Sequence, residues 1–297
     1  MPGSCRRRPP RKLLPLTPES DPPVSSRVAI SLGASFLGYA THAGFLARLH
    51  ALGLRPLAVG GSSAGAIAAG LHASGLPPEK CREVVTSWAF RQSFVQQTPW
   101  VTQYLRCTFA ESKPGLFRPE AAVTFLESIF GDLKIEDLTP RFMAAVSDLS
   151  THQTHFLTQG SLARAMVASC CVPTIFQPLH HADMDCFDGG VAHETPIDPW
   201  LEDPEIDTIL LHRVMHPRDD VPTMVPFNLI RLTAEAHACA SEQLLQYRLK
   251  LAQMHGKKVV VLTTHHERPA LLSGTEKQMH SFYEAGARTA EQYLQTT

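Results

Sequence analysis

The chain has 297 residues, of which 44% are hydrophobic and 19% charged, a composition typical of a globular protein with a large apolar core. Its formal net charge is −1 and it has no basic stripe with interleaved aromatic residues, so nucleic acid is not an expected partner. The seven cysteines are odd in number and lack CxxC spacing, which favours reduced thiols over a disulfide framework or a zinc site. We therefore expect a cytoplasmic protein without a metal site.

Residues 1–26 form a tail rich in proline and arginine. The tail has no apolar run of signal-peptide length, and the longest strongly apolar stretch, around residues 64–71, is too short to cross a membrane. We expect the tail to be disordered, with weak attraction to an anionic membrane surface as the alternative. One folded domain is expected over residues 27–297.

Strands and helices alternate along this domain. Strands are expected at 27–32, 57–59, 142–147, 153–158, 207–213 and 257–264. Helices are expected after residue 38 as far as about 53, after residue 63, and at 119–129, 162–170, 227–255 and 275–295. Residues 78–110 are expected to be helical but irregular, and their six aromatic residues suit either the core or the wall of a substrate cleft. The alternation predicts a three-layer α/β/α sandwich around a mainly parallel central sheet.

Ser63 lies in the run Val-Gly-Gly-Ser-Ser-Ala-Gly, where a short strand meets a helix of small residues. Gly61 and Gly65 flank it in a GxSxG pattern, and a sharp strand-to-helix turn leaves no room for side chains at these two positions. The helix that follows directs free N–H groups toward developing negative charge. Ser63 is therefore a candidate nucleophile, although an isolated GxSxG also occurs at purely structural turns.

A second glycine-containing turn, residues 33–38, precedes the first helix and ends at Gly38. It partly resembles a dinucleotide-binding turn, but that function needs a carboxylate about 20 residues further on. No Asp or Glu occurs between Asp21 and Glu79. Two such turns separated by one helix should open at the same edge of a parallel sheet, where backbone N–H groups can hold an oxyanion. The expected donors lie at Gly33, Ala34, Ser35 and Ala64.

The best candidate for the base that activates the serine is Asp188, in the turn Asp188-Gly189-Gly190. Two glycines let the backbone approach another segment and leave the carboxylate unobstructed, although such a turn also serves simply to reverse a chain. Apolar neighbours suit a base because burial raises the pKa of a carboxyl. Asp148, which follows a predicted strand, is the second carboxylate candidate, and we interpret it as structural.

Together these motifs resemble those of the patatin-like phospholipases. The resemblance covers about residues 28–199 and rests on the two turns, the Ala-Ser-x-x-x-Pro-x-x-Phe-x-Pro stretch at 168–178, and Asp188-Gly-Gly. It implies that Ser63 is the nucleophile and Asp188 the general base of a dyad that hydrolyses lipid acyl esters through an acyl-enzyme, without a cofactor. The first turn usually reads Gly-Gly-Gly-x-Arg-Gly in that family, so Ala34, Ser35 and Leu37 depart from the pattern.

Two alternatives stay open at this point. A Ser-Asp-His triad would add a later histidine, namely His212, His265 or His280, but the elbow of such hydrolases normally follows several strands. A catalytically weak or silent lipid-binding or scaffolding protein of the same fold is the other alternative, because the turn at 33–38 is altered.

Overall fold

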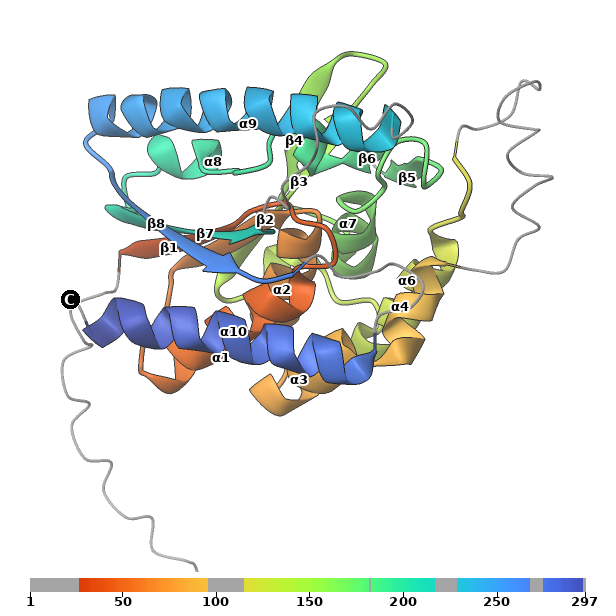
Figure 1. Ribbon diagram of the computed structural model, residues 1–297, viewed down its shortest axis with the longest axis horizontal. Helices are drawn as coiled ribbons and strands as arrows, with labels where there is room; N and C mark the ends of the chain where they lie inside the picture. Colours follow the sequence, from red (N-terminus) through yellow and green to blue (C-terminus); the bar gives the residue numbers. More distant parts are fainter. Residues whose placement is uncertain (1–26, 96–114, 182, 217–228, 268–274, 296–297) are drawn as a thin grey trace, which may run out of the picture.

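The computed structural model describes residues 27–95, 115–181, 183–216, 229–267 and 275–295. A mixed sheet runs through the molecule with helices on both faces, which confirms the predicted α/β/α sandwich (Figure 1). The strands are β1 (Val28–Leu32), β2 (Ala58–Ser62), β3 (Arg141–Asp148), β4 (Gln153–Leu157), β5 (Leu179–His181), β6 (Met184–Asp188), β7 (Thr208–Met215) and β8 (Lys258–His265). The α-helices are α1 (Tyr39–Ala51), α2 (Ala64–Ala73), α3 (Pro78–Thr86), α4 (Trp88–Phe94), α6 (Glu120–Phe130), α7 (Leu162–Ala168), α8 (Asp198–Leu201), α9 (Leu229–Met254) and α10 (Glu276–Gln295).

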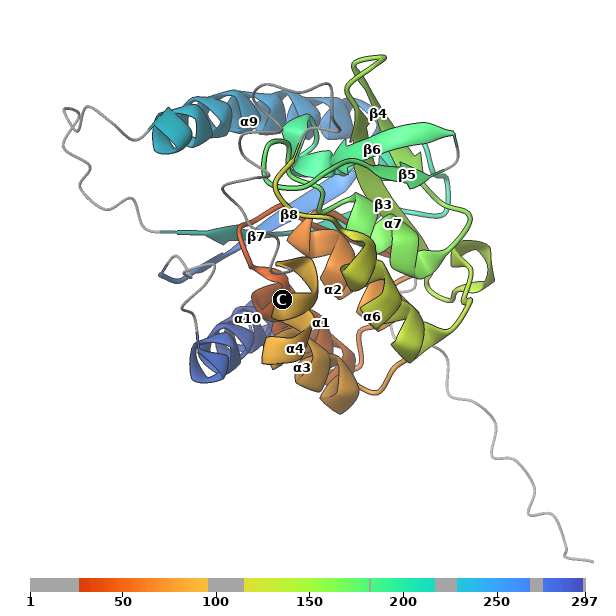
Figure 2. The same cartoon turned by 90° about the vertical axis from the view of Figure 1, so that its right-hand side faces the viewer.

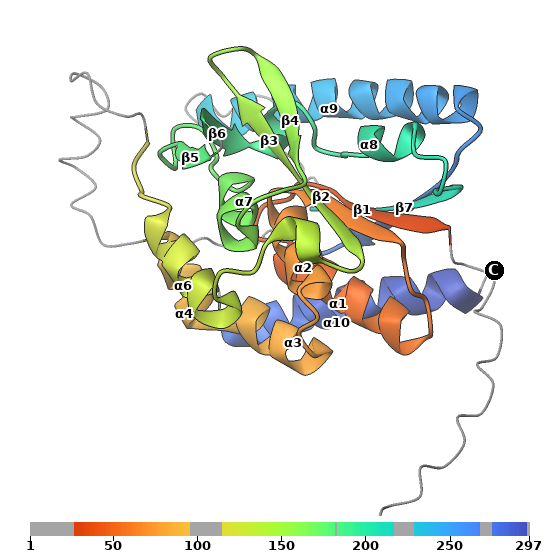
Figure 3. The ribbon, with the colours of Figure 1, turned by 180° about the vertical axis from the view of Figure 1, so that it is seen from behind.

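The centre of the sheet is parallel, as predicted, with strand order β3-β2-β1-β7-β8. Leu32 at the end of β1 lies opposite Gly61 on one side and His212 on the other, so the chain leaves these strands at one common edge. The remaining strands, β4, β5 and β6, pair in antiparallel fashion. β3 and β4 project from the sheet on the side of α9 (Figure 3).

The alternation of side chains along β1 explains the two helical layers. Val28, Ile30 and Leu32 pack in the core that also contains side chains of α1, α2, α7 and α10. Ala29 points to the other face and joins a smaller core formed with α8 and α9. Figure 2 shows the two layers on opposite sides of the sheet, with α9 on one side and α1, α2 and α10 on the other.

Some elements match the sequence-based expectation and others differ from it. Residues 78–94 are helical with an interruption, in keeping with the expected irregular helical segment, and the Ser87 hydroxyl starts α4 by accepting a hydrogen bond from the Phe90 N–H. The short strands β5 and β6 were not predicted. Residues 96–114, which include some of the aromatic residues of this segment, lie outside the described residues.

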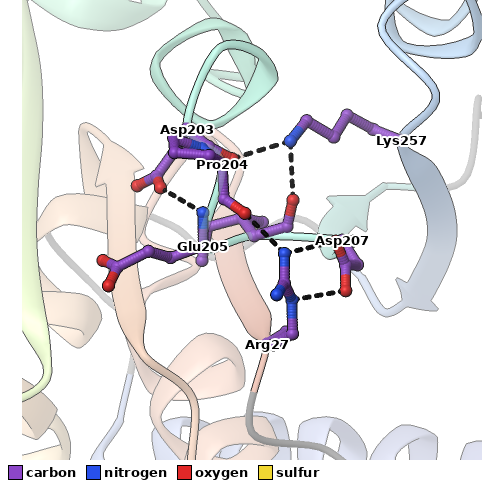
Figure 4. Close-up of polar contacts among 7 residues, drawn as sticks. Arg27, Asp203, Pro204, Glu205, Asp207 and Lys257 are labelled. Atoms are coloured by element: carbon purple, nitrogen blue, oxygen red, sulfur yellow. Dashed lines mark hydrogen bonds and ion pairs between the residues drawn. The ribbon is translucent and has the colours of Figure 1, made fainter.

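Side-chain contacts connect the amino ends of β1, β7 and β8, at the edge of the sheet opposite the turns at 33–38 and Ser63 (Figure 4). Arg27, just before β1, donates a 2.9 Å hydrogen bond from Nη2 to Asp207, just before β7. Lys257, just before β8, donates from Nζ to the carbonyl oxygens of Asp203 and Ile206 at 2.7 and 2.6 Å. These contacts hold the amino ends of β1, β7 and β8, and they leave the carboxyl ends to form the site.

Three expectations concern the chain as a whole. The tail at 1–26 lies outside the described residues. Cys5 and Cys107 also lie outside them, and the five cysteines within them are all free. Among the helices that the structure describes, none is both long enough and apolar enough to cross a membrane.

Candidate active site

Ser63 lies at the junction of β2 and α2 with a φ of 54° and a ψ of −122°. A positive φ is unfavourable for a residue with a side chain, so the surrounding structure must hold it. The packing around the turn is tight enough to do so. A Cβ at Gly61 would lie 2.3 Å from the Gly65 carbonyl carbon, and one at Gly65 would lie 2.2 Å from the Leu32 oxygen. This geometry is that of a nucleophile elbow.

Ser169, at the end of α7, holds the elbow from the side. Its hydroxyl accepts a 2.9 Å hydrogen bond from the Ser63 N–H and donates a 2.6 Å hydrogen bond to the Ala145 carbonyl oxygen of β3. Ser169 has no exposed surface, so its bond to Ala145 is shielded from water, and its bond to the Ser63 N–H is partly shielded. The 168–178 stretch was recognised in the sequence as a motif, and the structure shows this role for its serine.

The pairing along β3 brings the elbow next to Asp188. β2 pairs with residues 141–145 of β3 and ends with Ser62 opposite Ala145. β6 pairs with residues 146–148, and Asp188 lies opposite Val146. Because β4 pairs with residues 144–148, it occupies the other edge of β3, so β2 and β6 share one edge in succession. The end of β2 and the end of β6 therefore meet there.

The turn after Asp188 contacts both of the other turns. A Cβ at Gly189 would lie 2.3 Å from the Ala145 oxygen and 2.6 Å from Ser62 Oγ. A Cβ at Gly190 would lie 2.8 Å from the Ala34 Cβ. The two glycines thus allow the close approach that the Asp-Gly-Gly pattern predicted, against the elbow on one side and the 33–38 turn on the other.

Asp188 is 4% exposed, and burial raises its pKa from 3.8 to about 6. The Ser63 hydroxyl, the Gly190 N–H and the charge of His237 each offset part of this increase. Oδ1 accepts a 2.7 Å hydrogen bond from the Gly190 N–H, whereas Oδ2 makes no hydrogen bond of ordinary geometry within the described part of the chain. Asp188 therefore combines raised basicity with one free oxygen beside the serine.

The four N–H groups expected to bind an oxyanion differ in whether they already donate a hydrogen bond. The Gly33 N–H donates to the His212 carbonyl oxygen at 2.9 Å, and the Ala34 N–H donates to the Glu194 carbonyl oxygen at 2.7 Å. Within the described residues, the N–H groups of Ser35 and Ala64 have no acceptor. The N–H groups of Gly33 and Ala34 are therefore used to hold the turn in place. Of the four predicted donors, only Ser35 and Ala64 have an N–H group available to an oxyanion.

Two residues near Ser63 and Asp188 were not predicted from the sequence. The Cys170 thiol lies beside Ser63 and Asp188, and burial together with the Asp188 charge raises its pKa well above the ordinary value, so it is a neutral thiol. His237 of α9 contacts the Val191 carbonyl oxygen through Nε2 at 3.1 Å and lies near enough to lower the pKa of Asp188. Cys170 lies within the recognised 168–178 stretch, but no sequence signal marks His237.

The histidines considered for a triad lie in other environments. His212 is completely buried, with Nδ1 2.9 Å from His42 and Nε2 2.9 Å from Thr264. His265 and His280 are exposed on β8 and α10. The contacts of His212 occupy both ring nitrogens, so the geometry favours the dyad over a triad.

Asp148, the second carboxylate candidate, closes the turn between β3 and β4. Its oxygens accept hydrogen bonds from the Ser150 N–H, the Ser150 hydroxyl and the Thr151 hydroxyl at 2.8, 2.6 and 2.8 Å. These bonds lower its pKa to about 2, which makes it a weak base. Its contacts agree with the structural role expected from the sequence.

Two further features of the described residues concern metal ligands and a cavity. The described residues include no group of three or more side chains suited to hold a metal ion. A cavity of about 230 Å³ is lined by α1, by residues 75–81 and by two residues of α2, Ala68 and His72. Ser63 precedes the amino end of that helix, so this cavity is separate from the dyad.

Comparison with known proteins agrees with these motifs. The model of the patatin-like phospholipase family matches residues 30–201, more than half of the chain. The chain belongs to this family. It is 31% identical over 177 residues to uncharacterised NTE family proteins of Mycobacterium bovis and Mycobacterium tuberculosis, which covers 59% of this chain and 46% of each relative. The match thus spans about half the length of these curated relatives.

The fold also has a counterpart among solved structures. VipD from Legionella pneumophila superposes with a TM-score of 0.51 over 91% of this chain and 67% of that chain, at 14% sequence identity. At this identity the likeness concerns the fold alone. It agrees with the mixed sheet and flanking helices described above.

Proposed function

We propose that this patatin-like protein is a serine lipid acyl hydrolase that uses Ser63 and Asp188 as a catalytic dyad. The observation that carries the proposal is the pairing of a serine at positive φ with a buried carboxyl whose pKa is raised to about 6. A serine hydroxyl is a weak nucleophile until a neighbouring base accepts its proton, and a base is most effective when its pKa lies near the working pH.

In the first half of the reaction, Ser63 Oγ attacks the ester carbonyl carbon while Asp188 accepts the hydroxyl proton. The negative charge that develops on the carbonyl oxygen is held by the N–H groups of Ser35 and Ala64. Loss of one such donor costs about 3 kcal/mol of transition-state stabilisation in a measured protease. Asp188 then returns the proton to the departing alcohol as the carbon–oxygen bond breaks, which leaves an acyl-enzyme.

In the second half, water attacks the acyl-enzyme. Asp188 accepts a proton from the water, the same N–H groups hold the second oxyanion, and the proton returns to Ser63 Oγ as the fatty acid leaves. One carboxyl group thus serves both halves as base and then as acid.

A lipid substrate is supported by family membership and by the apolar surroundings of the dyad. Phe36, Val172 and Val191 are 36–39% exposed, and each lies on one of the turns or segments that form the site. Exposed apolar side chains around a nucleophile suit an acyl chain better than a polar substrate. Peripheral membrane contact and a cytoplasmic location are part of the same proposal.

The test combines covalent labelling with turnover. A fluorophosphonate should label the wild-type protein but not Ser63→Ala, and a panel of phospholipids and short-chain esters should be hydrolysed by wild type and by neither Ser63→Ala nor Asp188→Asn. Asp148→Asn is the matched control, since it neutralises a second buried aspartate of the same sheet. This variant should keep turnover.

Each outcome has a definite meaning. Absence of labelling in folded wild-type protein would favour a silent lipid-binding protein of the same fold. Turnover that survives Asp188→Asn but is lost in Asp148→Asn would assign the base to Asp148. A folded His212 variant that loses labelling and turnover as completely as Ser63→Ala would support a triad, whereas a partial loss of turnover would not.

A further inference from the structure

A buried line of polar side chains runs from the 33–38 turn to α10. Ser35 Oγ lies 3.5 Å from His42 Nε2, and His42 Nδ1 lies 2.9 Å from His212 Nδ1. His212 Nε2 lies 2.9 Å from Thr264 Oγ1, which lies 2.6 Å from Thr289 Oγ1. We call Ser35, His42 and His212 the turn network. Neither histidine has any exposed surface.

The two histidines touch the turn at three points. The His212 carbonyl oxygen accepts the Gly33 N–H at 2.9 Å. The His42 ring lies near the Gly33 backbone, and this contact raises the pKa of His42. The His42 ring also contacts the Ser35 hydroxyl. The Ser35 contact is long for a hydrogen bond, so the backbone contacts at Gly33 share the work of holding the turn.

Both imidazoles are neutral. Burial lowers the pKa of His42 to about 3, an effect that the Gly33 backbone partly offsets, and burial lowers the pKa of His212 well below its ordinary value. Two neutral rings that meet through their Nδ1 atoms share a single hydrogen, so one ring is protonated on Nδ1 and the other on Nε2.

The contacts at the two ends of the line allow two arrangements of the ring protons. Thr289 Oγ1 lies 3.3 Å from the Ala285 carbonyl oxygen, which can only accept a hydrogen bond. If Thr289 donates to it, Thr264 donates to Thr289 and accepts from His212 Nε2–H. His212 Nδ1 then accepts from His42 Nδ1–H, and His42 Nε2 is left to accept the Ser35 hydroxyl. The reverse polarity loses the bond to Ala285, but His42 Nε2–H then donates to the Ser35 hydroxyl, and the Gly33 contact that raises the pKa of His42 also calls for a ring N–H. Either arrangement therefore completes the line.

The turn that the histidines contact is strained. Leu37 adopts a φ of 52°, unfavourable for a residue with a side chain. The turn is also compact, because a Cβ at Gly38 would lie 2.0 Å from Ser35 Oγ. A strained turn keeps its shape only where its surroundings fix it, and oxyanion donors act well only when they are held in advance of the reaction.

We propose that His42 and His212 are positioning residues that hold the 33–38 turn so that the Ser35 N–H is in place to bind the oxyanion. This inference rests on the proposed hydrolase function, and it assigns a task to two buried histidines that the dyad does not use. Neither histidine is expected to contact the substrate.

Kinetics on a short-chain ester test the proposal. Ser35→Ala keeps the backbone N–H but removes the hydroxyl, and His42→Leu removes the ring. Each should lower kcat about tenfold with KM within about twofold, and the double variant should be no slower than the slower single variant, because both changes break one link. His42→Gln, which restores a polar side chain, should recover part of the loss.

His72→Leu is the matched control, because His72 is another histidine whose pKa is lowered mainly by burial and it lies at the far end of α2. Its kcat should equal that of wild type. Multiplicative losses in the double variant, a change in KM alone, or an equal loss in His72→Leu would each overturn the proposal.

Nitrogen-15 NMR of the imidazole rings gives a readout that does not depend on activity. We expect one ring of the His42–His212 pair to be protonated on Nδ1 and the other on Nε2, and Ser35→Ala to shift the His42 Nε2 resonance while leaving His72 unchanged. A His42 Nε2 resonance that does not respond to Ser35→Ala would refute the network. If wild type hydrolyses no ester, the proposed function fails, and the NMR result still decides whether the pair holds the turn.

Discussion

Replacing the proposed base by its amide should stabilise the protein while abolishing its activity. Asp188 has a pKa of about 6 in the folded chain and 3.8 without burial. The folded state therefore binds the proton more tightly than the unfolded state does. Between pH 4 and pH 6 the folded chain holds a proton that the unfolded chain has lost, so the free energy of unfolding falls as the pH rises through this window.

The size of the effect follows from the shift. About two pKa units correspond to about 3 kcal/mol that ionised Asp188 costs the folded state above pH 6. Asn at position 188 carries no charge, and its side-chain oxygen can still accept the Gly190 N–H. Relative to wild type, Asp188→Asn should therefore gain stability as the pH rises from 4 to 6, reach a gain of about 3 kcal/mol, and stay constant above pH 6.

Urea unfolding at half-unit intervals from pH 4 to pH 8 measures this difference. Asp198→Asn is the control of opposite sign. Burial opposes ionisation of Asp198, but its hydrogen bond with His193 and the charge of Arg248 outweigh burial and lower its pKa. That carboxylate stabilises the fold above its unfolded pKa, so its amide variant should lose stability at neutral pH. A stability difference between Asp188→Asn and wild type that is flat across pH 4–6 would refute our explanation of the raised pKa.

Three further variants probe the framework of the site. Ser169→Ala leaves the partly buried Ser63 N–H without its acceptor, and we expect a loss of about 1 kcal/mol in urea unfolding together with slower fluorophosphonate labelling. Gly65→Val places side-chain atoms against the Leu32 carbonyl, so labelling should disappear while circular dichroism stays near that of wild type. Lys257→Met removes two hydrogen bonds to backbone carbonyls at the opposite edge of the sheet, which should cost about 1–2 kcal/mol of stability and leave kcat unchanged. Retained labelling in Gly65→Val, or a lower kcat in Lys257→Met, would contradict these assignments.

The long elements of the fold were predictable because their sequences are strongly patterned. The predicted strands at 142–147 and 257–264 correspond to β3 and β8 within one or two residues at each end. β6 was missed because it carries aspartates at positions 185 and 188, and this polar pattern is more typical of a turn than of a strand. Its order in the sheet depends on pairing with β3, and no local pattern encodes that pairing.

Some features of the candidate site depend on residues close together in the sequence, and others depend on contacts between distant segments. Local spacing made Ser63 and Asp188 candidates, since each lies in a glycine turn, but their roles were predicted from the resemblance of several ordered motifs to one family. The state of the oxyanion turn could not be predicted locally, because Gly33 and Ala34 are held by the carbonyls of His212 and Glu194, far along the chain. Those two contacts occupy the first two N–H groups of the turn and leave that of Ser35 free. Two of the departures from the usual glycine pattern are at Ala34 and Ser35. The Ala34 N–H is already bonded to the Glu194 carbonyl oxygen, and the Ser35 hydroxyl contacts His42. It follows that the altered turn need not lack an oxyanion site, provided that its contacts with His212, Glu194 and His42 keep it in place.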